Sequence, residues 1–204
     1  MNKAKSTVFI VDDEPVIQDS LTALLVAEGI CCEVFGEPLR FLERIEPDCL
    51  GCLLLDLRMP GMDGLQLLKR LRARGIATPV IVLTVHADVP RAVAVMKAGV
   101  DHFIEKPFVA EDLLRRVWQL IERSSKRLQF QQRREQIKQC FESLTPREVE
   151  VLELIVEGEP TKRIAGKLGT SINTVRNQRS SILRKFQADS AVDLVRMAMV
   201  LRAG

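Results

Sequence analysis

The sequence has few of the features that mark membrane, secreted or disulfide-bonded proteins. No apolar run among its 204 residues approaches the ~20 residues of a membrane-spanning helix, so we expect no membrane association. Segment 1–7 has lysines, but Asp12 interrupts the apolar residues after it, which argues against a signal peptide. Five cysteines are an odd number, which argues against a disulfide framework and for a reducing, cytoplasmic location.

Metal sites built from sulfur and imidazole are also disfavoured. Cys49-Leu50-Gly51-Cys52 has the spacing of a metal or redox pair, but no second ligand pair follows, and the chain has only two histidines. Cys52 belongs to an apolar run, so we interpret it as a strand residue.

Four short apolar runs each end in polar residues. Helical patterns of roughly ten to fifteen residues separate the runs, which is typical of βαβ units and a parallel sheet. The carboxyl ends of parallel strands lie at one edge of the sheet, so the polar residues should meet there. These residues are Asp12 and Asp13 after 8–11, Asp56 after 52–55, Thr84 after 80–83, and Lys106 after 103–104.

Three carboxylates, a hydroxyl and an ammonium fit phosphoryl transfer to an aspartate. Clustered carboxylates repel unless a cation lies among them, and their oxygens suit Mg²⁺. An ammonium and a hydroxyl can bind phosphoryl oxygens. Asp56 is the candidate nucleophile, because Pro60-Gly61 turns the chain soon after it. Any one of these residues alone could instead be a turn residue or a helix cap.

As a set, these residues resemble the receiver domain of two-component response regulators, over about residues 6–122. The matching residues are Asp12-Asp13, Asp56-x-x-Met59-Pro60-Gly61-x-Asp63-Gly64, Thr84 and Lys106-Pro107. The resemblance implies a flavodoxin-like, doubly wound, five-stranded parallel sheet. It implies that a histidine kinase phosphorylates Asp56. It also implies that Mg²⁺, or Mn²⁺, binds Asp13, Asp56 and the Arg58 backbone carbonyl, with Asp12 acting through water.

The same resemblance gives roles to residues at the last two strands. Thr84 and Lys106 would bind phosphoryl oxygens, and Phe103 would be the switch aromatic. The Lys106-Pro107 bond corresponds to one that is cis in this family, although sequence alone gives a cis bond only a low prior.

The chain departs from the receiver pattern beside the switch threonine. Receivers usually have a small residue there, whereas this chain has Val85, and the flanking positions hold the bulky Arg58 and His86. We hypothesise that these side chains restrict access of water and small phosphodonors. We interpret His86 itself as a loop-surface residue in preference to a proton-transfer group.

Glycine and proline are both absent between Val109 and Thr145. Apolar residues keep helical spacing as far as Leu128, and 131–136 is then wholly polar. We expect a receiver at 1–122 and a helical linker at 123–142, with a polar connector of uncertain order. A rigid helical linker could transmit a rotation, which a Gly/Ser linker could not. The alternative is a solvated helix with a frayed end. Trp118 is interpreted as a core or dimer-face residue.

Residues 143–204 predict a separate, all-α domain of four helices. Thr145-Pro146-Arg147-Glu148 is a capping box with proline at the first helical position. Gly158 and Gly169 should end the first two helices, and Ser171 and Ser190 should begin the others. A short helix, a glycine turn and another helix form a helix-turn-helix pattern. The predicted apolar faces are Val149, Leu152, Ile155 and Val156; Ile164, Ala165 and Leu168; Ile172, Val175, Ile182 and Phe186; and Val192, Leu194, Val195 and Met199.

Basic charge is concentrated in the C-terminal part. Residues 1–121 carry 14 Lys and Arg against 17 Asp and Glu, whereas 122–204 carry 16 against 10, which suggests a polyanionic partner. Arginine and asparagine suit base edges, and basic side chains suit phosphates. On the polar face of the third helix, Asn173, Arg176, Asn177, Ser180 and Arg184 are base-reading candidates. Lys162, Arg163, Arg179 and Lys185 are phosphate candidates.

Residues 143–202 also resemble the LuxR-type helix-turn-helix of the NarL/FixJ subfamily of response regulators. The residues that carry it include Leu144–Glu148, Gly158, Leu168-Gly169 and Thr174-Val175-Arg176. The resemblance implies promoter binding by the third helix and dimerisation through the last. Relatives often have a basic residue in place of Ser180 and a histidine in place of Gln178. These differences put the operator sequence in doubt.

We therefore predict a transcription factor controlled by phosphorylation. Phosphate on Asp56 would draw in Thr84 and Phe103, favour a homodimer and place two domains on promoter half-sites. RNA polymerase is a further expected partner, and no turnover of an external substrate is expected. One alternative is a phosphatase, which needs a second acid where Arg58 lies. The other is a phosphate sink or adaptor whose helical domain binds protein or RNA.

Overall fold

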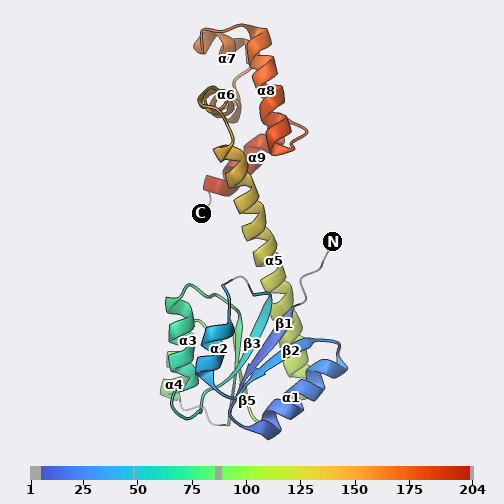
Figure 1. The fold of residues 1–204 in the computed structure, drawn as a ribbon, viewed down its shortest axis with the longest axis vertical. Coiled ribbons are helices and arrows are strands. Elements are labelled where there is room, and N and C mark those ends of the chain that lie inside the picture. Colours follow the sequence, from blue (N-terminus) through green and yellow to red (C-terminus); the bar gives the residue numbers. More distant parts are fainter. Residues whose placement is uncertain (1–5, 48, 86–88, 203–204) are drawn as a thin grey trace. The chain divides into compact units, whose positions relative to one another are not determined.

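A computed structural model of the protein describes residues 6–47, 49–85 and 89–202 (Figure 1). The chain forms two compact units, Met1–Leu128 and Gln129–Gly204. Within the described ranges, no helix is both long enough and apolar enough to cross a membrane. All five cysteines lie in these ranges, and all are free thiols.

The first unit is a parallel sheet covered by helices on both faces. The strands lie in the order β2-β1-β3-β4-β5, and every neighbouring pair is parallel. The doubly wound, five-stranded sheet predicted from the sequence is confirmed. Its strands are β1 (Thr7–Val11), β2 (Cys31–Phe35), β3 (Gly51–Asp56), β4 (Val80–Thr84) and β5 (His102–Glu105). Its helices are α1 (Pro15–Ala27), α2 (Pro38–Arg44), α3 (Gly64–Ala73), α4 (Val89–Lys97) and the first part of α5 (Ala110–Glu142).

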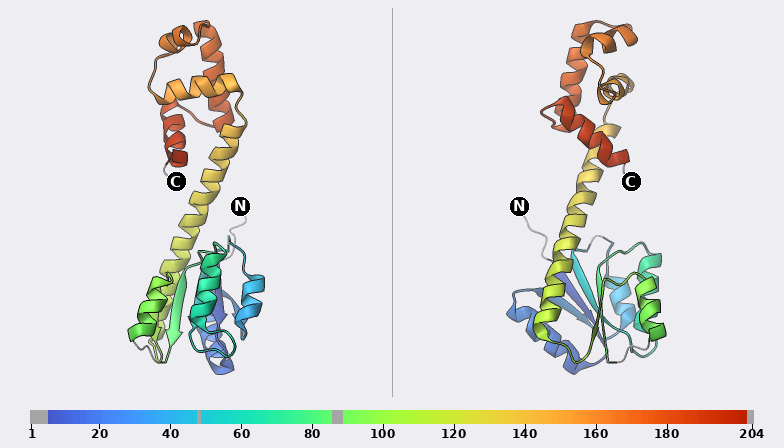
Figure 2. Two further views of the ribbon diagram at one scale, coloured as in Figure 1. Left: turned by 90° about the vertical axis from the view of Figure 1, so that its left-hand side faces the viewer. Right: turned by 180° about the vertical axis from the view of Figure 1, so that it is seen from behind.

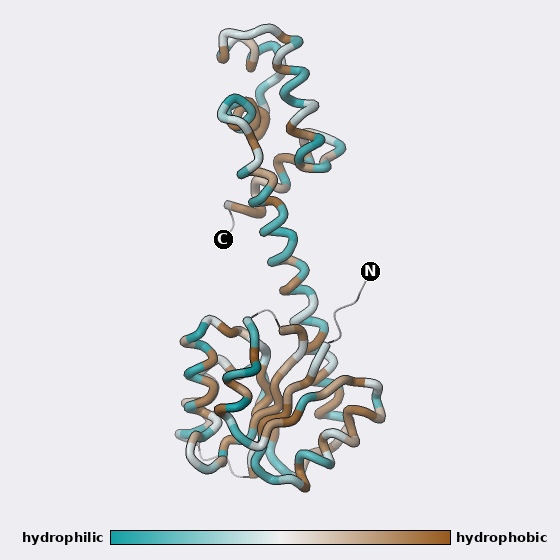
Figure 3. Tube along the Cα trace, viewed as in Figure 1, coloured by the Kyte–Doolittle hydropathy of each residue, from teal (hydrophilic) through white to brown (hydrophobic). Residues whose placement is uncertain are grey.

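Each face of the sheet has its own apolar core. Phe9, Val11 and Leu53 pack with α2, α3 and α4, whereas Ile10 and Leu54 pack with α1 and α5 (Figure 2). Successive side chains of a strand point to opposite faces, so a strand that is buried on both faces is apolar along its length. This explains the short apolar runs of the sequence, which appear as the brown strands of Figure 3.

Helix α5 is attached to the edge of the sheet where the strands begin. The buried Ser124 hydroxyl accepts a 3.1 Å hydrogen bond from the Gly51 amide. Arg123 forms a 2.6 Å ion pair with Asp101, and Arg127 donates to the Ala77 carbonyl at 2.5 Å. The polar contacts of the first unit with α5 therefore extend as far as Arg127.

The polar segment 131–136 does not interrupt α5. The helix continues without a break to Glu142, and the buried Ile137 joins the core of the second unit. The absence of glycine and proline leaves the backbone free to stay helical, and packing of Ile137 favours the helical form. Trp118 is 47% exposed on α5, so it is not a core residue.

The second unit is a small helical bundle around one apolar core. As predicted, four helices follow α5: α6 (Pro146–Val156), α7 (Thr161–Lys167), α8 (Ile172–Phe186) and α9 (Ala191–Arg202). Thr145 and Glu148 form the predicted capping box, and Ser171 caps α8 by accepting from the Thr174 amide at 3.0 Å. Gly158 follows α6 with a φ of 83°, a conformation that favours glycine.

Four residues predicted for the apolar faces of these helices are exposed. Val149 is 36% exposed, Ile172 40%, Val192 59% and Met199 62%, so these predictions are wrong. In α6 the inward position is taken by the buried Glu148, and Ile172 lies at the first position of α8. Helix α9 instead buries two residues four positions apart, Leu194 and Ala198.

Candidate functional site

The sequence predicted that five polar residues meet at the carboxyl ends of the strands, and the structure buries four of them there. Asp12 follows β1, Asp56 ends β3, Thr84 ends β4, and Lys106 follows β5. They are 1%, 5%, 1% and 9% exposed respectively. Such burial is rare for ionisable groups unless they are paired.

Lys106 is the centre of this cluster. Its ammonium lies 2.7 Å from Asp12 Oδ2 and 3.2 Å from Asp56 Oδ1. Burial lowers the pKa of Lys106, but the hydrogen bond and charge of Asp12, with the charge of Asp56, outweigh it and raise the pKa above 10.5. Burial raises the pKa of Asp56 above 3.8, and Lys106 offsets this only in part. One buried ammonium thus neutralises two buried carboxylates incompletely.

Backbone groups fix the two carboxylates. Asp56 Oδ2 accepts from the Arg58 amide at 2.5 Å, and Asp12 Oδ1 accepts from the Glu14 amide at 2.9 Å. Gly64 allows the loop after β3 to fold back, because a Cβ there would lie 2.2 Å from the Asp56 carbonyl oxygen. The Lys106-Pro107 peptide bond is cis.

The structure also describes most of the other predicted receiver residues. Asp13 is half-buried, and Arg58 is exposed. Phe103 is half-buried and packs on the core cluster of the α2–α4 face. Val85 is 48% exposed. His86 lies outside the described residues.

The donor types fit a divalent cation, since carboxylate oxygens are the ligands that Mg²⁺ prefers. Their arrangement places Lys106 between Asp12 and Asp56. Within the part of the chain that the structure describes, no three acidic, histidine or cysteine side chains are grouped so that they could hold a metal ion. The ammonium supplies one positive charge to this pair of carboxylates.

Sequence reasoning missed one residue beside the site. Arg91 of α4 donates to the Leu57 carbonyl at 3.1 Å and pairs with Asp63 at 3.4 Å. It therefore joins α4 to the loop that follows Asp56. A single arginine on an amphipathic helix has no local signal for this contact, because its partners lie about 30 residues earlier in the chain.

The second unit presents a polar face on α8. Val175, Ile182 and Phe186 point into the core. The predicted base-reading residues are all exposed: Asn173, Arg176, Asn177, Ser180 and Arg184. Among the phosphate candidates, Lys162 and Arg163 are exposed, whereas Arg179 is half-buried and donates to the Thr161 hydroxyl at 3.3 Å.

Comparisons with known proteins give a family for each of the two parts of the chain. Residues 8–118 match the response regulator receiver domain family, and residues 142–198 match the luxR family of bacterial regulatory proteins. The chain belongs to the NarL/FixJ-type response regulators. Its two domains are a receiver and a LuxR-type DNA-binding domain, and it is a transcriptional response regulator, as the sequence predicted.

Similar proteins match this response regulator over nearly their whole length. The transcriptional regulatory protein FixJ of Bradyrhizobium diazoefficiens is 36% identical, over 98% of this chain and 97% of FixJ. The C4-dicarboxylate transport transcriptional regulatory protein DctR of Rhodobacter capsulatus is 44% identical, over 94% of this chain and 98% of DctR. The solved structure of the response regulator StyR matches 96% of this chain and 99% of the StyR chain with a TM-score of 0.88. The two sequences are 39% identical.

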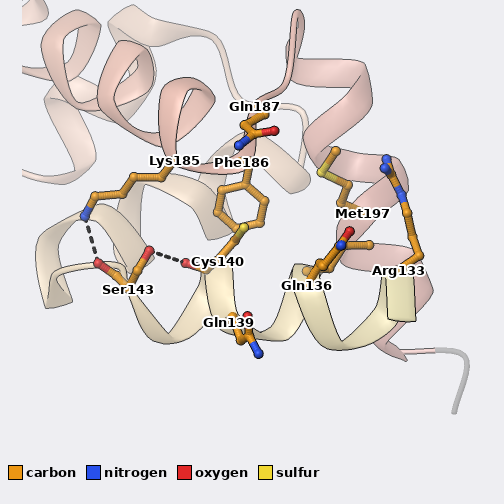
Figure 4. A pocket seen from close by; sticks show the side chains of 10 residues that line it. Arg133, Gln136, Gln139, Cys140, Ser143, Lys185, Phe186, Gln187 and Met197 are labelled. Carbon is orange, nitrogen blue, oxygen red and sulfur yellow. Dashed lines mark hydrogen bonds between the residues drawn. The ribbon is translucent and has the colours of Figure 1, made fainter. Parts of the chain in front are cut away.

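Lys185 of the response regulator is the phosphate candidate that pairs with a buried carboxylate. Its ammonium donates to Glu148 Oε2 at 2.7 Å and to the Ser143 carbonyl at 2.8 Å. Figure 4 shows the Ser143 contact among the side chains that line an open cavity of about 520 Å³, which Arg133 and Met197 also line. The sequence paired Glu148 only with Thr145, as a capping box, and gave no signal that it also reaches α8.

Glu148 is held as a carboxylate by these contacts. Its pKa is lowered from 4.5 to about 2, first by the hydrogen bond from Lys185, then by those from the Thr145 amide and the Ser181 hydroxyl. A lowered folded pKa stabilises the fold above 4.5, and this contribution is lost as the pH falls toward 2.

Proposed function

We propose that a histidine kinase phosphorylates Asp56 and that the phosphorylated protein binds promoter DNA through the exposed face of α8. The observation that carries the proposal is the buried Lys106 ammonium between Asp12 and Asp56 at the carboxyl edge of the sheet. An incompletely neutralised carboxylate beside a fixed ammonium has both a nucleophilic oxygen and a binding site for phosphoryl charge.

In the proposed transfer, a carboxylate oxygen of Asp56 attacks the phosphorus of the kinase phosphohistidine. The P–O bond forms, the P–N bond breaks, and the imidazole leaves, so that Asp56 becomes an acyl phosphate. Lys106 and Thr84 then bind phosphoryl oxygens. No external substrate is turned over, and the only chemistry is gain and loss of phosphate on Asp56.

The residues proposed to hold Mg²⁺, or Mn²⁺, are Asp13, Asp56 and the Arg58 carbonyl, with Asp12 acting through water. When bound, the ion would neutralise the negative charge that gathers as phosphate approaches the carboxylates. The chain's own contribution is to keep Asp56 oriented through the Arg58 amide and to hold the Lys106 charge beside it.

Phosphate on Asp56 is proposed to draw Thr84 inward and let Phe103 turn, which would remodel the face of α4 and β5. Arg91 supports this route, because it already ties α4 to Leu57, the residue after Asp56. The new face would favour a homodimer that pairs two DNA-binding domains and recruits RNA polymerase. The five free thiols accord with a reducing, cytoplasmic location.

Measurements of DNA binding at several salt concentrations test the proposed role of α8 in the LuxR-type domain. We expect the protein to enrich particular duplexes from a random pool, with an affinity that falls steeply as salt rises. Arg176→Ala should weaken binding to a selected duplex by about 1–3 kcal/mol, because it removes one base contact. The affinity of the Arg176→Ala protein for a scrambled duplex should change much less. Enrichment of RNA or protein without DNA would favour an adaptor instead.

Val85→Ala should speed the loss of phosphate from Asp56 several-fold. Val85 follows Thr84 directly and is 48% exposed, so its branched side chain is placed to obstruct water. Single-turnover decay of the phosphorylated protein would measure this. Val26→Ala, an exposed valine at the far end of α1, is the matched control. An unchanged or slower loss of phosphate in Val85→Ala would contradict the hypothesis that Val85 restricts access of water.

A further inference from the structure

We propose that Glu148 and Lys185 are a positioning pair that fixes the orientation of α8, so that Lys185 supports sequence-specific DNA binding from inside the domain and does not contact phosphate. The inference rests on the proposed DNA-binding role of α8. It differs from the role that the sequence suggested for Lys185.

The contacts of Glu148 join two helices. Glu148 lies in the first turn of α6 and is 6% exposed. Its Oε1 accepts from the Ser181 hydroxyl at 2.7 Å, and its Oε2 accepts from Lys185 at 2.7 Å. Residues four positions apart share one face of a helix. One buried carboxylate therefore holds two successive turns of α8 against α6.

Two further contacts make this connection rigid. The Thr145 amide donates to Glu148 Oε2 at 2.9 Å, and Lys185 also donates to the Ser143 carbonyl at 2.8 Å. The turn before α6 is thus attached to the same pair. A buried carboxylate that loses its cation is costly, so Lys185 cannot turn outward to a phosphate without leaving Glu148 unpaired.

The base-reading candidates lie next to the residues that the pair holds. Ser180 and Arg184 immediately precede Ser181 and Lys185, and both are exposed. A rotation of α8 about its axis that released Ser181 or Lys185 would move Ser180 and Arg184 by a similar angle. Hydrogen bonds to base edges depend on such angles, whereas the attraction of a basic surface for phosphate depends on them far less.

Lys162 provides a matched comparison. It lies on α7 and is exposed, and its side chain makes no hydrogen bond or ion pair within the described ranges. Lys162 is therefore placed to act as an ordinary phosphate contact. The two lysines should respond differently to the same substitution.

The test compares Lys185→Gln with Lys162→Gln in the full-length protein. Two duplexes of equal length serve as probes: one selected by the unmodified protein from a random pool, and a scrambled version of it. Fluorescence anisotropy over a salt series gives both affinities and their salt slopes. Thermal melting shows whether each variant is folded.

Lys185→Gln should weaken binding to the selected duplex by about tenfold or more, the loss that one mismatched base pair causes. Its affinity for the scrambled duplex and its salt slope should stay unchanged. Lys162→Gln should weaken both duplexes alike and reduce the slope by about 0.9. If Lys185→Gln behaves as Lys162→Gln does, Lys185 is a phosphate contact and the proposal is overturned. An unchanged affinity for both duplexes would also overturn it.

Ser181→Ala keeps the test decisive if Lys185→Gln is poorly folded, and a double variant tests the pairing if the single variants fold. Ser181→Ala removes one hydrogen bond to Glu148 and should cause a smaller loss with the same preference for the selected duplex. The double variant Glu148→Gln with Lys185→Gln should lose no more affinity for the selected duplex than the weaker-binding single variant does. The reason is that the two substitutions remove the same Glu148–Lys185 contact. Additive losses would count against a pair. If the unmodified protein enriches no duplex at all, the proposed DNA-binding function itself fails.

Discussion

Lys106→Met should destabilise the receiver by about 3–5 kcal/mol at neutral pH, the usual cost of removing one partner from a buried ion pair. The methionine fills a similar volume but leaves Asp12 and Asp56 facing each other without a cation. Both carboxylates are at least nine-tenths buried, so water replaces the ammonium poorly. The loss should exceed that of any exposed lysine in the domain.

The pH dependence of this loss has a definite sign. The pKa of Asp56 is already raised above 3.8 by burial, and removal of Lys106 raises it further. A raised folded pKa gives stability that is fully present below 3.8 and is lost as the pH rises through the folded value. The difference in free energy of unfolding between Lys106→Met and the unmodified protein should therefore shrink as the pH falls toward 3.8.

Urea unfolding of both proteins between pH 4 and pH 8 would measure the difference. Lys97→Met is the control, because Lys97 is exposed in the last turn of α4 and should give a small change at every pH. A loss in Lys106→Met that stays constant across this range would mean that carboxylate repulsion is not its cause.

The receiver site was predictable because its signal is both local and topological. An apolar run followed by a carboxylate marks the end of a buried strand, and parallel pairing then brings the strand ends together. Asp12, Asp56, Thr84 and Lys106 need no other information to be placed at one edge. What the pattern could not give was the order of contacts within the cluster, in which Lys106 lies between two carboxylates.

The contacts that escaped prediction are those between side chains far apart in the chain. Arg91 reaches Leu57, and Glu148 reaches Lys185, without any periodicity that would mark either contact. The prediction that Ile172 faces the core was wrong for a different reason. A helical wheel assigns it to the apolar face, but a residue in the first turn can lie beyond the neighbouring helix and remain exposed.

Asp56→Asn should abolish the gain in DNA affinity that phosphorylation confers. In the unmodified protein, beryllofluoride with Mg²⁺ should mimic the acyl phosphate and tighten binding to a selected duplex by about 5–150-fold, the usual range of coupling between two sites. An asparagine amide offers no carboxylate oxygen to beryllium or phosphorus. The variant should therefore bind DNA with the same affinity in the presence and absence of beryllofluoride.

The folded state should tolerate this substitution. Because burial raises the pKa of Asp56, its ionised form is disfavoured in the folded protein. A neutral amide avoids that cost, and Lys106 keeps Asp12 as a partner at 2.7 Å. We expect Asp56→Asn to be at least as stable as the unmodified protein at pH 7, with the difference shrinking as the pH falls toward 3.8.

Anisotropy at fixed salt, with and without beryllofluoride, separates signalling from folding. Asp19→Asn, an exposed acid on α1, should keep the full gain. Lys106→Met and Asp56→Asn should both lose the gain, but only Lys106→Met should also lose stability, because it leaves charge unpaired where Asp56→Asn removes charge. Equal affinity of the unmodified protein under both conditions would show that the receiver does not control DNA binding through Asp56.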